Sequence, residues 1–143
     1  CLMHNKANTK YNNFLTDMLT ETQECVNIAR KAGIKDERII LDPGVGFGKT
    51  YEMNLEIIDK MECLNKLGYP VLLGTSRKSV IGLTLDLPVE EREDLPVDQR
   101  VEGTIATSVI GVMKGCAFVR VHDVKENRRA VLMTEAILGR NIK

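Results

Sequence analysis

The amino-acid sequence predicts an α/β protein made of consecutive strand–helix units, four of them. Three observations support this: short apolar runs alternate with longer segments of helical periodicity, glycine follows several of the helical segments, and charged groups stand where the apolar runs stop. Alternation of this kind implies right-handed βα units and a parallel sheet. At 143 residues the chain has about the length of one domain.

The first predicted unit contains the end of a strand, a polar loop and a helix. Residues 1–4 are expected to be the strand and 5–12 the loop. From Phe14 to Lys31 apolar residues recur at nearly helical spacing, and Gly33 is a suitable place for the helix to end. The chain opens without methionine and without a helix cap, so we expect it to be a piece of a longer protein.

The second and third units begin with short β-branched or apolar runs. The run 38–41 predicts a strand that ends at Asp42, and 70–74 predicts the next strand. Between them we expect one helix over about 53–67, with Leu55 among the residues of its apolar face. A glycine follows this helix and is expected to end it.

The last unit follows a segment of different composition. Residues 83–99 contain two prolines and an acidic run, which predicts a surface loop that could include a short helix. The helix expected over 99–114 is rich in small residues, which allow close packing against the fold or a partner. A strand at 117–121 and a helix at 124–138, stopped by Gly139, complete the chain.

The composition excludes several classes of protein. Lysine plus arginine equals aspartate plus glutamate, 20 each, so no bulk charge attracts nucleic acid or a membrane surface. No apolar run approaches the roughly 20 residues that span a bilayer, and no signal-peptide pattern is present. The four cysteines are widely spaced, which favours reduced thiols in a cytoplasmic protein. A zinc site that combines them with His4 and His122 is an alternative.

The segment 41–50, LDPGVGFGKT, has the glycine content of a phosphate-binding loop but not its spacing. A Walker A loop needs four residues between its first glycine and Gly-Lys-Thr, whereas Gly44 and Gly48 are separated by three. A Rossmann fingerprint fails because one residue separates Gly46 from Gly48. The segment therefore indicates a tight turn with positive φ, or a place where a flat ligand ring approaches the backbone.

Charged residues at the predicted strand ends could form one polar pocket. Asp42 could accept paired N–H donors from a heterocycle such as an aminopyrimidinone, or cap its own turn. Only one of Arg77 and Lys78 is expected to face the pocket, because neighbouring side chains in an extended segment point opposite ways; a solvated basic turn is the alternative. Arg120 and His122 share a face of one strand, where a partly buried Arg120 would need an anion or a structural acid.

These clusters favour half of a (β/α)₈ barrel over an open doubly wound sheet. Active sites of such barrels lie at the C-terminal ends of the strands, and the last two strands often build a phosphate site. A complete barrel needs about 250 residues, so four units form half of one, and a phosphate site after its last two strands would make residues 1–143 strands five to eight, with the N-terminal half absent. Two bare sheet edges would then remain, unless a partner chain supplies the other half.

Four segments in register resemble the C-terminal half of the dihydropteroate synthase family. They are 41–50 (LDPGVGFGKT), 74–79 (GTSRKS), 100–107 (RVEGTIAT) and 119–124 (VRVHDV), and the leading LMH at 2–4 also fits. The resemblance implies a transferase of folate biosynthesis, a sulfonamide target. It would condense 6-hydroxymethyl-7,8-dihydropterin diphosphate with p-aminobenzoate, releasing pyrophosphate in the presence of Mg²⁺. A weaker relative is the pterin-binding barrel of folate- and corrinoid-dependent methyltransferases.

The resemblance also implies roles for individual residues. The residues carried over as pterin-binding are Met3, Asp42, Gly46, Phe47, Lys78 and Arg120. Those carried over as p-aminobenzoate-binding are Phe47, Lys78 and Ser79. Arg120 and His122 would hold the diphosphate, and the catalytic residues would be Lys78, Arg120 and His122. No metal ligand is expected in this chain, because the metal-binding asparagine of the family belongs to the N-terminal half.

The resemblance further implies that the complete protein is a homodimer, with contacts from the helices near 100–114 and 124–138. Alone, the chain is expected to show at most a trace of activity. Two alternatives stay open: a non-catalytic half barrel that binds pterin or anions, and a pterin-binding domain of a methyltransferase. A P-loop nucleotide-binding domain is disfavoured by the glycine spacing.

Overall fold

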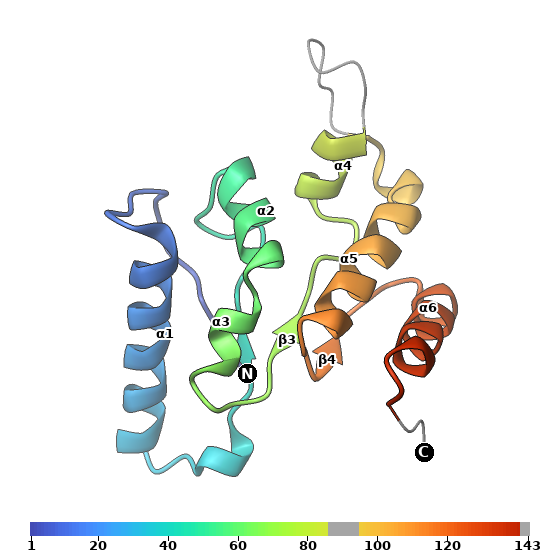
Figure 1. Ribbon diagram of the computed structural model, residues 1–143. Coiled ribbons are helices and arrows are strands. Elements are labelled where there is room, and N and C mark those ends of the chain that lie inside the picture. Colours follow the sequence, from blue (N-terminus) through green and yellow to red (C-terminus); the bar gives the residue numbers. More distant parts are fainter. Residues whose placement is uncertain (86–94, 141–143) are drawn as a thin grey trace.

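The structure is a computed structural model that describes residues 1–85 and 95–140. Its strands are β1 (Leu2–Met3), β2 (Leu41–Asp42), β3 (Leu72–Leu73) and β4 (Phe118–Val119). Strand β1 pairs in parallel with β2, and β3 pairs in parallel with β4. A parallel bridge between Leu41 and Val71 joins the two pairs. Each strand is followed by helix, so the predicted α/β class and the parallel order of the strands are confirmed (Figure 1).

The regular strands are shorter than the sequence predicts. Hydrogen bonds continue beyond them, from Leu2 N to Ile40 O (2.8 Å) and from Arg120 N to Leu73 O (2.9 Å). The prediction of strand at 38–41 is wrong at its start, because Asp36–Arg38 forms the 3₁₀ turn η1. The Asp36 carboxylate pairs with the Arg30 guanidinium at 2.7 Å, which ties this turn to the preceding helix.

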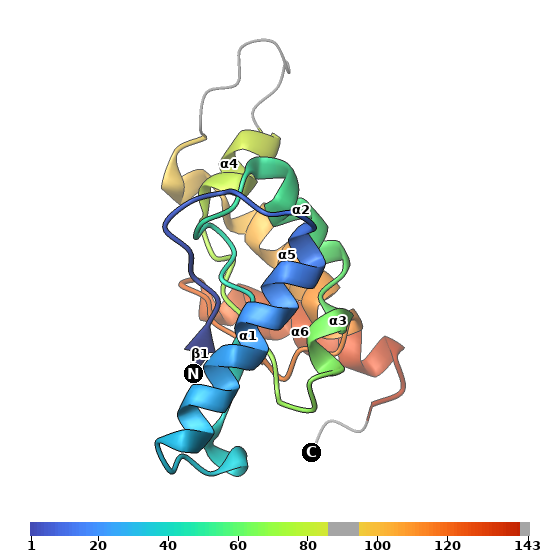
Figure 2. The ribbon, with the colours of Figure 1, turned by 90° about the vertical axis from the view of Figure 1, so that its left-hand side faces the viewer.

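Helix α1 (Phe14–Lys31) has the bounds that the sequence predicts. The Asn13 side chain caps it by accepting a hydrogen bond from Thr16 N at 3.1 Å. Gly33 follows with a φ of 82°, the left-handed conformation that commonly ends a helix. Figure 2, which views the molecule from the side of α1, shows this helix beside β1 and the N-terminus.

The single helix predicted over 53–67 is two helices, α2 (Tyr51–Asp59) and α3 (Glu62–Asn65). The chain leaves helical geometry at Lys60, which ends α2 with φ −103° and ψ 19°. Leu55 is 41% exposed, so its expected place on the buried face is wrong. The residues that α2 buries are Asn54, Ile57 and Ile58.

Helix α4 (Ser79–Leu85) was not predicted and begins directly after the Ser76–Lys78 turn. The 3₁₀ helix η3 (Val97–Gln99) lies within 83–99, the predicted surface loop that could include a short helix. The acidic run within 86–94 falls outside the described residues. Helices α5 (Val101–Met113) and α6 (Val124–Ile137) agree with the predictions to within two residues at either end.

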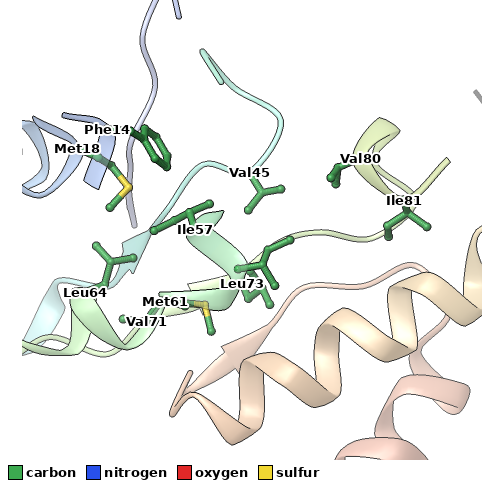
Figure 3. Packing of buried hydrophobic residues seen from close by; sticks show 11 residues of the cluster. Phe14, Met18, Val45, Ile57, Met61, Leu64, Val71, Leu73, Val80 and Ile81 are labelled. Atoms are coloured by element: carbon green, nitrogen blue, oxygen red, sulfur yellow. The ribbon is translucent and has the colours of Figure 1, made fainter. Parts of the chain in front are cut away.

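The main core lies between the strands and helices α1 to α4 (Figure 3). Its buried residues are Phe14, Met18, Val45, Ile57, Ile58, Met61, Leu64, Val71, Leu73, Val80 and Ile81. Helix α5 packs closely on this core, because a Cβ on Gly111 would come within 2.7 Å of Leu73. Helix α6 joins α5 through a buried hydrogen bond from Ser108 Oγ to Asn127 Oδ1 (2.8 Å). Among the described helices, none is long and apolar enough to cross a membrane.

Candidate functional site

Asp42 stands at the end of β2 with cations around its carboxylate. Oδ1 accepts a hydrogen bond from Gly44 N at 2.7 Å, and Oδ2 faces the end of β3, 3.8 Å from where a Cβ on Gly74 would lie. Burial raises the pKa of Asp42, whereas the Gly44 bond and the charges of Lys78 and Arg120 act in the opposite direction. Asp42 therefore caps its own turn with Oδ1, and Oδ2 can accept a hydrogen bond from a ligand.

The glycine-rich segment is the tight turn that the sequence predicts. Gly44, Gly46 and Gly48 have φ values of 66°, 84° and 58°, in the left-handed region that favours glycine. A Cβ on Gly46 would lie 3.2 Å from Lys78 Cδ, so the missing side chain lets Lys78 approach the backbone. On this side the Lys78 side chain therefore lies directly against the backbone of the turn.

Lys78 is the cation that faces Asp42. Its ammonium donates a hydrogen bond to Val45 O and lies 4.6 Å from the centre of the Phe47 ring. Burial lowers the pKa of Lys78, and the carboxylate of Asp42 opposes that shift. Ser79 follows directly as the first residue of α4, with an exposed side chain.

Arg77 turns away from this cluster, as expected for one of two adjacent cations. Its guanidinium forms a two-fold ion pair with Asp123, with N–O distances of 2.6 Å and 3.1 Å. Its φ is 58°, and its backbone is held by Thr104 Oγ1 and by the Arg100 guanidinium. Motif spacing does not reveal these roles of Asp123, Thr104 and Arg100, although the last two lie in the RVEGTIAT segment.

His122 and Arg120 follow β4. Ser76 Oγ lies 2.9 Å from His122 Nδ1 and accepts a hydrogen bond from His122 N at 3.0 Å, which joins the loops after β3 and β4. The side chain of Arg120 is exposed, because β4 is an edge strand here, and its partial burial inside a complete barrel stays a prediction. Within 1–85 and 95–140 no carboxylate forms an ion pair with Arg120, so its guanidinium can still bind an anionic ligand.

Two more residues lie next to Asp42 or to the glycine turn. Met3 pairs with Asp42 across the β1–β2 register, which places it beside the carboxylate. Lys49 was missed, although it follows the glycines directly. Its ammonium lies 3.0 Å from Gly44 O, from Phe47 O and from His4 Nδ1, and burial lowers its pKa to about 8.

All four cysteines are free, and Cys1 and Cys25 are exposed. In the part of the chain that the structure describes, no group of three or more His, Cys, Asp or Glu side chains could hold a metal ion. The described residues therefore give no support to the zinc alternative.

Comparisons with known proteins show the family and agree with the fold. A model of the pterin-binding enzyme family matches residues 1–122. The chain is 61% identical to dihydropteroate synthase of Clostridium beijerinckii, over 98% of this chain and 49% of the relative. For the Bacillus subtilis synthase the identity is 51%, over 97% and 46% of the two chains.

Solved structures give the same result. The Clostridium difficile dihydropteroate synthase, crystallised in the presence of pteroic acid, superposes with a TM-score of 0.88 at 46% identity, over 96% of this chain and 49% of that one. The Thermus thermophilus synthase in complex with 6HMPPP superposes with a TM-score of 0.81 at 36% identity, over 94% and 51%. The chain spans about half the length of the relatives that it matches.

Proposed function

The chain belongs to the pterin-binding enzyme family, and we propose that it is the C-terminal half of a dihydropteroate synthase. Residues 1–143 would supply strands five to eight of a TIM barrel. In the complete protein, 6-hydroxymethyl-7,8-dihydropterin diphosphate would condense with p-aminobenzoate to give 7,8-dihydropteroate and pyrophosphate. The observation that carries this proposal is that Lys78 and Arg120, which follow β3 and β4, lie close enough for their charges to act on the Asp42 carboxylate at the end of β2.

Asp42 would recognise the pterin. Its Oδ2 is not used by the turn, so the carboxylate can accept paired N–H donors from the 2-amino group and N3 of the ring. Gly46 lacks a side chain next to Lys78, and Met3 stands beside Asp42 across the sheet register. Lys78 would also donate to the pterin, because its ammonium lies close enough to Asp42 for their charges to interact.

The p-aminobenzoate would lie against Phe47, Lys78 and Ser79. Phe47 is 40% exposed, and the Lys78 ammonium lies over its ring. The ring of an aromatic acid could therefore pack beside Phe47 while its carboxylate pairs with Lys78. The amine is a modest nucleophile, and its orientation toward the pterin methylene would contribute much of the rate.

Arg120 and His122 would hold the diphosphate. In the reaction the amine nitrogen bonds to the pterin methylene carbon and loses a proton, while the C–O bond breaks and pyrophosphate takes the electron pair. Cations placed at that leaving group lower the barrier. Arg120 lacks an acid partner in the described residues, and Ser76 fixes His122 through Nδ1. Lys78, Arg120 and His122 are therefore the proposed catalytic residues.

Mg²⁺ is the proposed cofactor, but the described residues of this chain do not by themselves form a binding site for Mg²⁺. They hold no cluster of three candidate ligands, and Asp123 is engaged by Arg77. The diphosphate and the complementary half of the barrel would supply the remaining oxygen ligands.

We also propose that the complete protein is a cytoplasmic homodimer that binds neither nucleic acid nor membrane. The described faces of α5 and α6 expose large apolar residues suited to a dimer contact: Ile110, Met113, Met133 and Ile137. The four free thiols suit a reducing compartment. A Yersinia pestis dihydropteroate synthase has been solved with a sulfonamide drug, and we propose that this protein is a sulfonamide target as well.

Pyrophosphate release tests the proposal. The complete protein and the 143-residue chain are each supplied with dihydropterin diphosphate, p-aminobenzoate and Mg²⁺. Lys78→Ala is compared with Lys66→Ala, which changes an exposed lysine at the end of α3. We expect turnover that requires p-aminobenzoate in the complete protein, a loss of about 100-fold or more in Lys78→Ala, and at most a trace from the chain alone.

Two outcomes would contradict the proposed activity, and a third would contradict the proposed role of Lys78. Pterin binding without turnover in the complete protein would favour a non-catalytic pterin-binding half barrel. Methyl transfer from a folate in place of pyrophosphate release would favour the pterin-binding domain of a methyltransferase. Equal rates in Lys78→Ala and Lys66→Ala would remove Lys78 from the catalytic residues.

A further inference from the structure

The Lys49 ammonium is fully used by three acceptors. Nζ lies 3.0 Å from Gly44 O, from Phe47 O and from His4 Nδ1. An ammonium carries three N–H donors and no acceptor, so none is left for a substrate. Lys49 thus differs from Lys78, whose ammonium donates to one acceptor among the described residues, Val45 O.

Two of these acceptors belong to the turn that shapes the site. Gly44 O also accepts the bond from Phe47 N at 3.0 Å, and Gly44 N donates to Asp42 Oδ1. Phe47 O lies beside the ring that Lys78 covers. Lys49 therefore ties both ends of the 44–47 turn to one point, next to the carboxylate and the aromatic ring of the proposed pterin pocket.

The third acceptor belongs to a buried anchor outside the turn. His4 is 4% exposed and its Nε2 lies 2.8 Å from Glu21 Oε2 on α1. Since Lys49 donates to Nδ1, a neutral His4 carries its proton on Nε2 and donates it to Glu21. Burial lowers the pKa of His4, which is consistent with the neutral ring. Lys6 holds the other Glu21 oxygen at 2.6 Å.

The backbone contact between the two segments is equally close. A Cβ on Gly44 would lie 1.8 Å from His4 O, and His4 N donates to Asp42 O at 2.9 Å. The turn is thus pressed against the end of β1, and Lys49 bridges the same pair of segments through side chains. Position and orientation of the turn are set together by these contacts.

We propose that Lys49 is a positioning residue for pterin binding: through the His4–Glu21 anchor it clamps the 44–47 turn and so fixes Asp42 and Phe47 in the pocket. The pterin as ligand rests on the proposed function, whereas the clamp rests on the contacts alone. A long-range effect of the Lys49 charge on Asp42 is the competing explanation, because that charge also acts on the Asp42 carboxylate.

Amide hydrogen exchange of the complete protein without ligand tests the clamp. Lys49→Met removes the three donors at similar length, and Lys31→Met is the matched control at an exposed lysine of α1. The amides of Gly46, bonded to Asn54 Oδ1, and of Phe47 report on the turn. We expect their exchange to quicken about tenfold or more in Lys49→Met and to stay unchanged in Lys31→Met. Unchanged exchange in Lys49→Met would overturn the clamp.

Titration with 6-hydroxymethylpterin, followed by its own fluorescence, tests the consequence for binding. Lys49→Met should raise the dissociation constant about tenfold in a folded sample. Lys49→Arg keeps the charge, but its planar fork cannot converge on the same three acceptors, so it should not restore affinity. Full rescue by Lys49→Arg would overturn the clamp in favour of the charge effect. Failure of the unaltered protein to bind the pterin would reject the proposed function, and the exchange result would still decide the clamp.

Discussion

Replacing Asp42 by asparagine isolates the charge of the central carboxylate. Asparagine has nearly the same shape, and its carbonyl oxygen can still accept the bond that Gly44 N donates at 2.7 Å. The atom that takes the place of Oδ2 becomes an NH₂ group, which would face the N–H donors of the pterin. The turn should survive the change while recognition of the ring is lost.

The size of the effect follows from the two hydrogen bonds assigned to Asp42. Charge-assisted hydrogen bonds contribute about 1.5–3 kcal/mol each, so their loss should weaken binding by about 3 kcal/mol or more. About 1.4 kcal/mol corresponds to a tenfold change, which makes the expected loss of affinity about 100-fold. The donor–donor conflict in the variant acts in the same direction.

Asp42→Asn should weaken pterin binding without lowering the stability of the folded protein. Because burial raises the pKa of Asp42, the folded protein holds the proton more tightly than the unfolded chain does. The contribution of Asp42 to stability is therefore present below its ordinary pKa and is lost as the pH rises through the higher folded value. At pH 7 the buried charge is a net cost, so Asp42→Asn should keep or increase the free energy of unfolding.

The assay pairs pterin titration with urea unfolding of the complete protein at pH 7. Asp59→Asn serves as control, since Asp59 is exposed at the end of α2. The reasoning is refuted when folded Asp42→Asn binds 6-hydroxymethylpterin within about threefold of the unaltered protein. It is also refuted when Asp59→Asn weakens binding as much.

Two further predictions concern stability. Ser108→Ala removes the donor to Asn127 Oδ1 and leaves a buried oxygen without its bond, so urea unfolding should show a loss of about 1–3 kcal/mol; an unchanged midpoint would contradict this. Burial lowers the pKa of Lys49 from 10.5 to about 8. Between pH 8 and pH 10.5 Lys49 therefore holds its proton in the unfolded chain but not in the folded protein. The free energy of unfolding should rise with pH over this range, by up to about 3 kcal/mol. Unfolding at pH 7.5 and pH 10 should show this rise in the unaltered protein and a smaller one in Lys49→Met; equal rises would contradict the assignment.

Local sequence determined the elements whose signals lie within one or two turns of chain. Helix α1 has its predicted bounds because Asn13 caps its start, Gly33 permits its end, and its apolar residues repeat at helical spacing. The positive φ angles of the glycine turn and the place of Asp42 at a strand end were likewise readable, since each depends on neighbouring residues.

Tertiary structure decided which charged groups are engaged and which are left for a ligand. Arg77 and Lys78 are adjacent and chemically alike, yet Arg77 is taken by Asp123, 46 residues away, and Lys78 faces Asp42. Lys49 likewise depends on His4, 45 residues away. Periodicity and motif spacing carry no information on such partners, because a side chain meets them only when parallel strands bring distant segments together. The sequence by itself therefore determined the order of elements and the residues at the strand ends, and only the packed fold decided their partners, burial and pKa values.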